Sequence, residues 1–304
     1  MGSIYTKQER SDSDDSDRSE IPENNGLIFN ECFFPPEVVM HILTFLDPIS
    51  RRKDPPVLRG RLVCRAWRDM IDSPSFWRIK VLREVPGATH RVFHNELMWS
   101  DYYHLCAKKP HKKNLVKNGS AEDDLKHWSA GNAIYGGSRW KVENQPIGCD
   151  AFPAGTRKCF VTSFEWCSAE QIINLRHFGL TPNFMKHVKP FIYIEEWHTG
   201  RFDCGFEYSL NVTLLSNSWD IVDTFVYNTL GHSTEWKKVR HCFSNYDKEV
   251  AAIVFTHKGK DTQFWAGHYG SKITGARVYV TFPGCEEIED PLPATTAAGG
   301  RQPQ

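Results

Sequence analysis

The sequence predicts an α+β protein in which a small helical region precedes an antiparallel β-sandwich. Two features of the 304-residue chain support this class. Apolar residues recur at helical spacing through about residue 110, and from about Leu115 short runs of β-branched and aromatic residues alternate with Gly, Asn and Asp. The length allows about two domains, and a composition that is 40% hydrophobic and 13% aromatic provides apolar side chains for their cores.

Three helices are expected in the first 110 residues. The first covers about 37–46, because two consecutive prolines place proline at a helix start and apolar residues then recur at helical spacing. After a Pro- and Arg-rich link at 49–56, apolar side chains share one face over 58–70 and predict a second helix, which Ser73-Pro74 ends. A third helix is expected over about 95–106 and leads to the β region.

Beyond residue 115 the pattern predicts short antiparallel strands. Residues 206–214 alternate apolar and polar side chains with a period of two, as a strand with one buried face does. Ser168 to Gln171 matches a capping box, so one or two helical turns are expected there. Short strands at this spacing indicate a sandwich of two sheets. The strands are expected near 138–143, 158–165, 191–198, 205–215, 220–227, 236–243, 250–257, 262–266 and 275–282.

Both ends of the chain have the composition of disordered tails. Residues 1–30 are rich in Ser and Asp, and residues 283–304 are rich in Pro, Ala, Gly and acidic side chains, so neither buries enough apolar surface to offset the entropy of ordering. The N-terminus lacks the apolar segment of a secretory signal, and no apolar run is long enough for a membrane span. We therefore expect a cytoplasmic protein, with the nucleus as a second location.

The formal net charge of zero hides an uneven distribution. Residues 51–117 contain sixteen basic and six acidic side chains, whereas the rest of the chain is acidic on balance. Such a basic block could follow a nucleic-acid backbone, but its arginines are interleaved with apolar residues such as Trp67 and Trp77. Because that pattern is typical of the solvated face of amphipathic helices, nucleic acid is not an expected partner.

No metal site, cofactor or catalytic centre is predicted. The nine cysteines contain no C-x-x-C pair, the thirteen histidines contain no H-E-x-x-H motif, and no glycine-rich phosphate loop is present. Glu195 and Glu196 are adjacent on a predicted strand, so they should face opposite sides, one of them solvated, and cannot form a glycosidase pair. The chain is therefore expected to be non-catalytic.

Three stretches of the helical region match one motif: Phe34–Leu46, Arg61–Arg68 and Ser75–Trp77. Together they resemble an F-box. The resemblance implies a three-helix module at about 31–80 with an apolar ridge that docks on the Skp-type adaptor of an SCF-type cullin-RING ubiquitin ligase. Some of the motif residues are expected to be module core. The expected adaptor-binding residues are those at the motif's positions: Pro35, Pro36, Val39, Ile42, Leu43, Leu62, Val63, Cys64 and Trp67.

Five stretches of the β region match a second family in that family's order: Trp140–Glu143, Ser163–Cys167, Trp197–Gly205, Tyr208–Leu215 and Phe264–Gly270. They resemble the F-box-associated domain of the sugar-recognising F-box proteins. In that family the domain is a jelly-roll-like β-sandwich, and its better-studied members bind the inner chitobiose of high-mannose N-glycans in a pocket on loops at one end. The resemblance implies such a sandwich at 115–282, joined to the F-box by a helical linker at 81–114.

The resemblance also implies glycan-binding residues: Asp203, Phe264 and Trp265. A carboxylate at Asp203 would accept hydrogen bonds from a sugar, and the indole of Trp265 would stack on the apolar face of a pyranose. The sugar-binding members have Tyr-Trp-Lys where this chain has Phe264-Trp265-Ala266, so a hydroxyl and an ammonium are missing. An alternative reading makes Phe264 and Trp265 strand residues that pack the core.

The expected function is that of a substrate-recognition subunit. The F-box would bind the Skp-type adaptor and thereby the cullin, and the sandwich would bind the chitobiose core of N-glycans on misfolded or retrotranslocated glycoproteins. A first alternative keeps the adaptor role but has the sandwich recognise a non-glycan protein. A second alternative, a sandwich enzyme acting on carbohydrate, is disfavoured because the sequence supplies no acid and base for it.

Overall fold

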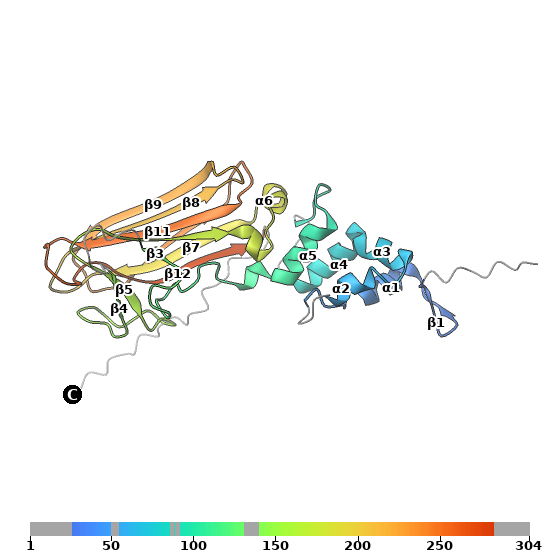
Figure 1. Cartoon of the computed structure of the whole chain (residues 1–304), viewed down its shortest axis with the longest axis horizontal. Coiled ribbons are helices and arrows are strands. Elements are labelled where there is room, and N and C mark those ends of the chain that lie inside the picture. Colours follow the sequence, from blue (N-terminus) through green and yellow to red (C-terminus); the bar gives the residue numbers. More distant parts are fainter. Residues whose placement is uncertain (1–25, 50–54, 86–87, 89–91, 131–139, 283–304) are drawn as a thin grey trace, which may run out of the picture.

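A computed structural model describes residues 26–49, 55–85, 88, 92–130 and 140–282. Helices gather at one end of the elongated molecule and strands at the other (Figure 1). This arrangement confirms the predicted α+β class, with a helical module before an antiparallel sandwich. The predicted tail at 283–304 lies outside the described residues, as do residues 1–25 of the predicted tail at 1–30 and most of the link at 49–56.

Three longer helices and one short helical turn build the helical module. The predicted second helix, over 58–70, is wrong as one continuous element, because the chain turns at residues 61–64 between α2 and α3. A tertiary contact fixes this turn, since the guanidinium of Arg61 binds both carboxylate oxygens of Asp72 at 2.6 and 2.8 Å. A hairpin of β1 (Ile28–Phe29) and β2 (Cys32–Phe33) precedes the module. The helices are α1 (Pro36–Leu43), α2 (Pro56–Gly60), α3 (Arg65–Asp72) and α4 (Pro74–Glu84).

The predicted break at Ser73-Pro74 is confirmed, and a further helix, α4, follows it. The Ser73 hydroxyl accepts a hydrogen bond from the backbone N–H of Phe76 (3.2 Å), and Pro74 occupies the first helical position. Phe76 and Trp77 are completely buried. The sequence pattern did not predict α4 because a charged residue, Lys80, lies in the middle of its buried face.

A helical linker joins the module to the sandwich. Its helix α5 (Trp99–Lys108) begins later than expected because the Asp101 carboxylate accepts a hydrogen bond from the backbone N–H of Met98 (3.0 Å) and caps the helix there. The Trp99 ring stacks on Trp77 of α4, with centroids 6.4 Å apart. The 3-10 turn η2 (Pro110–Lys112) follows α5. No helix within the described part of the chain is long and apolar enough to cross a bilayer.

Two five-stranded antiparallel sheets form the sandwich. The first sheet has the order β10-β7-β12-β5-β4 and the second has the order β3-β6-β11-β8-β9. Alternate residues of each strand point into the space between the sheets, as Phe206, Tyr208, Leu210 and Val212 of β8 do. The strands are β3 (Ser129–Ala130), β4 (Trp140–Glu143), β5 (Cys159–Thr162), β6 (Cys167–Asn174), β7 (Phe191–Thr199), β8 (Phe206–Leu215), β9 (Ile221–Gly231), β10 (Lys237–Phe243), β11 (Ala252–Asp261) and β12 (Lys272–Thr281).

Two sequence-based predictions in the β region are wrong. The capping-box sequence from Ser168 to Gln171 lies in strand β6, not in a helix, because all eight residues of β6 pair with β11 and alternate ones face the core. Residues 262–266 form a loop instead of a strand. Helical structure follows β6, in η3 (Leu175–Phe178) and α6 (Pro182–Val188).

Candidate functional site

The predicted adaptor-binding residues separate into buried and exposed groups. Val39 and Leu43 lie in the module core, each 2% exposed. Leu62, Val63 and Ile42 are open to solvent, with Leu62 76% exposed. Apolar side chains with this exposure are suited to docking on a partner, and these three are the exposed members of the expected ridge. Pro35 and Pro36 are also exposed, at the start of α1.

Cys64 and Trp67 are half-buried, and Trp67 holds the module together. Cys64 is the residue that precedes α3. The Trp67 indole N–H donates a hydrogen bond to the carbonyl of Gly26 (2.8 Å), and its ring lies 6.2 Å from that of Phe29. Trp67 therefore fixes the segment before α1 against α3. Further apolar side chains are exposed on the module and are not among the expected adaptor-binding residues; they include Phe33, Val38 and Phe45.

Three loops meet at the end of the sandwich that is far from the helices (Figure 1). We call them the distal loops: residues 163–166 between β5 and β6, 200–205 between β7 and β8, and 262–271 between β11 and β12. Asp203 lies on the second of these loops, and Phe264 and Trp265 lie on the third. The loops are bonded to each other, since the N–H of Thr262 donates to the carbonyl of Gly205 (3.0 Å).

Phe264 and Trp265 point outward because of a buried carboxylate. Asp261 accepts hydrogen bonds from the backbone N–H groups of Gln263 (3.0 Å) and Phe264 (2.6 Å), which ends β11 in a tight turn. Phe264 has a φ of +58°, in the left-handed region that non-glycine residues seldom adopt. Phe264 is 71% exposed and Trp265 43% exposed, so neither packs the sandwich core. The alternative that they are core residues of a strand is wrong.

A chain of contacts joins Trp265 to Asp203. The Trp265 ring meets the edge of Tyr269, with centroids 5.6 Å apart, and the Arg201 guanidinium lies 4.8 Å from the centre of the Tyr269 ring. Arg201 in turn donates to both carboxylate oxygens of Asp203, at 2.8 and 2.9 Å. Arg201 lowers the pKa of the Asp203 carboxyl by this pairing. The predicted residues Asp203 and Trp265 thus belong to one surface, connected by two residues that were not named from the sequence.

Other aromatic side chains extend the distal surface. Phe164 of the first distal loop meets Phe264 edge to face, with centroids 5.0 Å apart. Phe202 and Trp166 are exposed, and the ammonium of Lys260 lies 5.2 Å from the centre of the Trp166 ring. Aromatic faces next to charged groups are suited to binding a ligand that has both apolar and hydroxylated faces.

Family matches agree with this division of the chain. Residues 33–83 match the description F-box-like, and residues 106–280 match the description F-box associated region. This chain belongs to the F-box proteins with an F-box associated region. F-box proteins are substrate adaptors of ubiquitin ligases, which partner a Skp-type adaptor and a cullin. The finer boundaries expected at 30, 80, 114 and 282 stay predictions.

Relatives carry both parts of the protein. F-box only protein 6 of Mus musculus is 37% identical over 249 residues, which cover 80% of this chain and 81% of the relative. F-box only protein 44 of Homo sapiens is 35% identical over 236 residues, with 75% and 89% covered. F-box only protein 27 of Mus musculus is 30% identical over 259 residues, with 81% and 89% covered.

Solved structures similar to the sandwich include a carbohydrate-binding module in complex with β-1,4-galactotriose. The TM-score is 0.37 and the identity is 14%, and the match covers 57% of this chain and 100% of that chain. A xylan-binding domain from Paenibacillus barcinonensis has a TM-score of 0.35 and 11% identity, covering 56% and 96%.

The adjacent glutamates of the F-box associated region face opposite sides of β7, as predicted. Glu195 lies on the outer face and accepts a hydrogen bond from the Tyr279 hydroxyl (3.1 Å). Glu196 points inward, where the Tyr208 hydroxyl donates to it (2.5 Å) and Nδ1 of His257 lies 2.9 Å away. Both are buried, so the expectation that one is solvated is wrong. Their opposite directions exclude a carboxylate pair acting on one bond.

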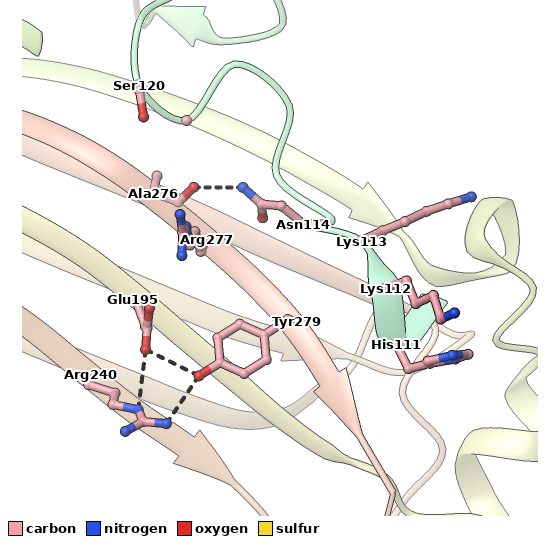
Figure 2. Close-up of a pocket in the computed structure, with 11 residues that line it drawn as sticks. His111, Lys112, Lys113, Asn114, Ser120, Glu195, Arg240, Ala276, Arg277 and Tyr279 are labelled. Atoms are coloured by element: carbon pink, nitrogen blue, oxygen red, sulfur yellow. Dashed lines mark hydrogen bonds and ion pairs between the residues drawn. The ribbon is translucent and has the colours of Figure 1, made fainter. Parts of the chain in front are cut away.

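A cavity of about 460 Å³ lies on the outer face of the first sheet, where the linker crosses β12. Figure 2 shows Arg240 bonded to Glu195 and Tyr279, with the Asn114 side chain donating to the carbonyl of Ala276 across the cavity. The charged lining is mainly basic and comes from Lys112, Lys113, Glu195, Arg240 and Arg277. None of these residues belongs to the distal loops, so the distal surface and this cavity are separate features.

Proposed function

We propose that this F-box protein is the substrate-recognition subunit of an SCF-type cullin-RING ubiquitin ligase, and that its distal loops bind the chitobiose core of N-glycans on misfolded or retrotranslocated glycoproteins. The F-box holds the Skp-type adaptor, and the adaptor connects it to the cullin. The protein contributes proximity, because it keeps substrate lysines within reach of a charged ubiquitin carrier. Because retrotranslocated glycoproteins are in the cytoplasm, we expect the protein to act there.

The observation that carries the proposal is the exposed indole of Trp265 beside the Arg201–Asp203 pair. An indole face that is open to solvent buries the apolar face of a pyranose, while carboxylate and guanidinium groups bond its hydroxyl and acetamide groups. Tyr269 and Arg201 bring a phenolic hydroxyl and a cation to the same surface. The sugar-binding members supply a hydroxyl and a cation through the Tyr and Lys that this chain replaces with Phe264 and Ala266. Tyr269 and Arg201 would supply the same two kinds of group here.

One observation favours the alternative of a non-glycan protein substrate. Both oxygens of Asp203 are already bonded to Arg201, and the exposed Phe202 and Phe264 extend the surface with purely apolar area. A ligand that gains most of its affinity from apolar burial would use Phe202 and Phe264 and leave the ion pair intact. In this case the distal loops would bind an extended apolar peptide.

A glycan array with the full chain, followed by titration calorimetry, distinguishes the two. We expect binding to glycans that contain chitobiose, and a roughly 10- to 100-fold weaker affinity in Trp265→Ala, because burying a large aromatic side chain is worth about 1.5–3 kcal/mol. The matched control is Trp219→Ala. Trp219 is also exposed, at 63%, but it lies between β8 and β9 at the opposite end of the sandwich.

Two results would reject glycan recognition by the distal loops. The first is an array with no chitobiose binding by a chain that still binds the Skp-type adaptor, which would favour the protein substrate. The second is equal affinity in the Trp265→Ala and Trp219→Ala variants, which would place the sugar elsewhere on the molecule.

A further inference from the structure

Two histidines and a glutamate meet where the linker touches the sandwich. His94 and Glu96 lie just before α5, and His187 lies in the last turn of α6. One donor atom from each of the three side chains lies within 4.8 Å of the other two. His94 and Glu96 are outside both family matches, and His187 is inside the F-box associated region. The three residues therefore connect the linker to the sandwich.

The backbone that carries His94 is held in place. The N–H of His94 donates to the Tyr102 hydroxyl of α5 (3.2 Å), and its carbonyl accepts from the N–H of Leu97 (3.2 Å). Burial raises the pKa of the Tyr102 hydroxyl, so it stays protonated around neutral pH. Both the N–H and the carbonyl of His94 are therefore hydrogen-bonded, which fixes its backbone.

The backbone of Glu96 is fixed to the helix that carries His187. The Asn183 side-chain amide donates to the Glu96 carbonyl (3.1 Å) and to the Asp101 carboxylate (3.2 Å). Asn183 and His187 are four residues apart on α6, so they lie on the same face of that helix. The main chains of all three residues are thereby positioned before any ligand binds, while the side chains keep the freedom to rotate.

We propose that His94, Glu96 and His187 form a zinc-binding site. Two imidazoles and one carboxylate are a donor set that Zn²⁺ prefers, at about 2.0–2.2 Å from each donor, and water takes the fourth position of a tetrahedral ion. Donors around such an ion lie about 3.3–3.5 Å apart. The Glu96 side chain is 63% exposed and His94 is exposed as well, so both rotate through the small distance that remains.

Zinc in this site would cross-link the linker to α6. The F-box and the distal loops are connected through α5, which lies next to both His94 and α6. An ion bound at this point fixes the direction in which the sandwich presents its substrate relative to the adaptor. We infer that zinc rigidifies this joint without touching the distal loops.

Hydrogen exchange of the full chain, with and without one equivalent of Zn²⁺, tests the site. We expect zinc to slow exchange in residues 92–98 and 182–188, which contain the three proposed ligands. Zinc bound by cysteines elsewhere in the chain would not protect these two segments, so their protection identifies this site. Calorimetric titration should show a Kd about 10- to 100-fold higher in His187→Ala and in Glu96→Gln. Affinity should also fall as the pH is lowered, because protons compete with zinc for imidazole.

His177→Ala is the matched control, since His177 is an exposed histidine of η3 that is not one of the three residues. It should bind zinc as the unchanged chain does. All the altered residues are at least partly exposed, and circular dichroism verifies that each variant folds. Zinc binding of equal affinity in His187→Ala and His177→Ala would overturn the proposal, and so would zinc-independent exchange of residues 92–98 and 182–188.

Discussion

At the residue scale, Leu43 and Leu62 show that one apolar motif has two physical roles. Leu43 is buried against the other helices of the F-box, whereas Leu62 projects from the turn before α3 and is 76% exposed. An exposed leucine contributes nothing to the isolated fold and becomes valuable only when a partner covers it. Substitutions at the two positions should therefore have different consequences.

We predict that Leu62→Asp removes adaptor binding and leaves the fold intact. In the complex the adaptor would bury this leucine, so the variant loses that apolar burial and buries a charge instead. Together these effects cost about 3 kcal/mol or more, so the affinity for the Skp-type adaptor should fall at least roughly 100-fold. Thermal unfolding should be unchanged. In contrast, Leu43→Asp should unfold the F-box. Calorimetric titration and thermal melts check both, and undiminished adaptor binding by Leu62→Asp would refute the docking ridge.

At the element scale, a buried lysine joins two helices of the F-box. The Lys80 ammonium of α4 is fully buried and donates to the carbonyls of Thr44 (2.9 Å) and Leu46 (2.7 Å), just after α1. Glu84, one turn later on α4, lies 2.6 Å from the same ammonium. The lysine thus satisfies carbonyls that the end of α1 leaves without intrahelical partners.

We predict that Lys80→Met destabilises the F-box by about 2–4 kcal/mol. Methionine fills a similar volume, but the carbonyls of Thr44 and Leu46 and the Glu84 carboxylate lose their buried partner. Urea unfolding should detect the loss, and adaptor binding should weaken in proportion to the unfolded fraction. Lys108→Met, at an exposed position at the end of α5, serves as the control and should be neutral.

At the scale of the whole molecule, a buried histidine makes the stability of the sandwich depend on pH. His198 of β7 is 1% exposed and stacks on Tyr208, with ring centroids 4.3 Å apart. Burial lowers the pKa of His198 to about 4 from its ordinary value of 6.5. Between pH 6.5 and pH 4, His198 binds a proton in the unfolded chain but stays neutral in the folded chain, so acidification favours unfolding.

We predict that the free energy of unfolding falls as the pH decreases from about 6.5 to about 4. The shift in the pKa of His198 alone accounts for about 3 kcal/mol across this interval, and it contributes nothing above pH 6.5, where both states are neutral. Denaturant unfolding at a series of pH values should show a shallower decline in His198→Phe. The exposed control His177→Gln should retain the full slope, and identical slopes in all three proteins would exclude His198 as the cause.

The elements that sequence patterns predicted well are those whose local signal agrees with their tertiary environment. Side chains of strand β8 alternate between the core and the outside, which matches the period of two in its sequence. Helix α1 begins at a proline, as the sequence predicts. Local signals failed where a distant partner prevailed. Ser168 to Gln171 satisfies a capping box, yet eight pairings with β11 hold it as a strand. Residues 262–266 look like a strand, but here the overlooked signal is itself local, because the Asp261 carboxylate accepts from the N–H groups of Gln263 and Phe264 and turns the chain into a loop.

The distal surface was predicted only in part, because one of its contacts joins residues far apart in the chain. Asp203, Phe264 and Trp265 are named by motifs in the sequence, but no motif indicates that Arg201 lies against Tyr269 and so connects Asp203 to Trp265. The contact between Arg201 and Tyr269 crosses from one loop to another about seventy residues later. It exists because β7 and β12 are neighbours in the first sheet.

The sequence alone determined the order of the two modules and the α+β class, because helical and strand periodicity and turn residues are local properties. Tertiary structure alone decided which apolar residues stay exposed and that His94, Glu96 and His187 converge. The physical reason is that exposure and convergence depend on strand pairing and helix packing between residues far apart in the chain. No window of neighbouring residues contains that information.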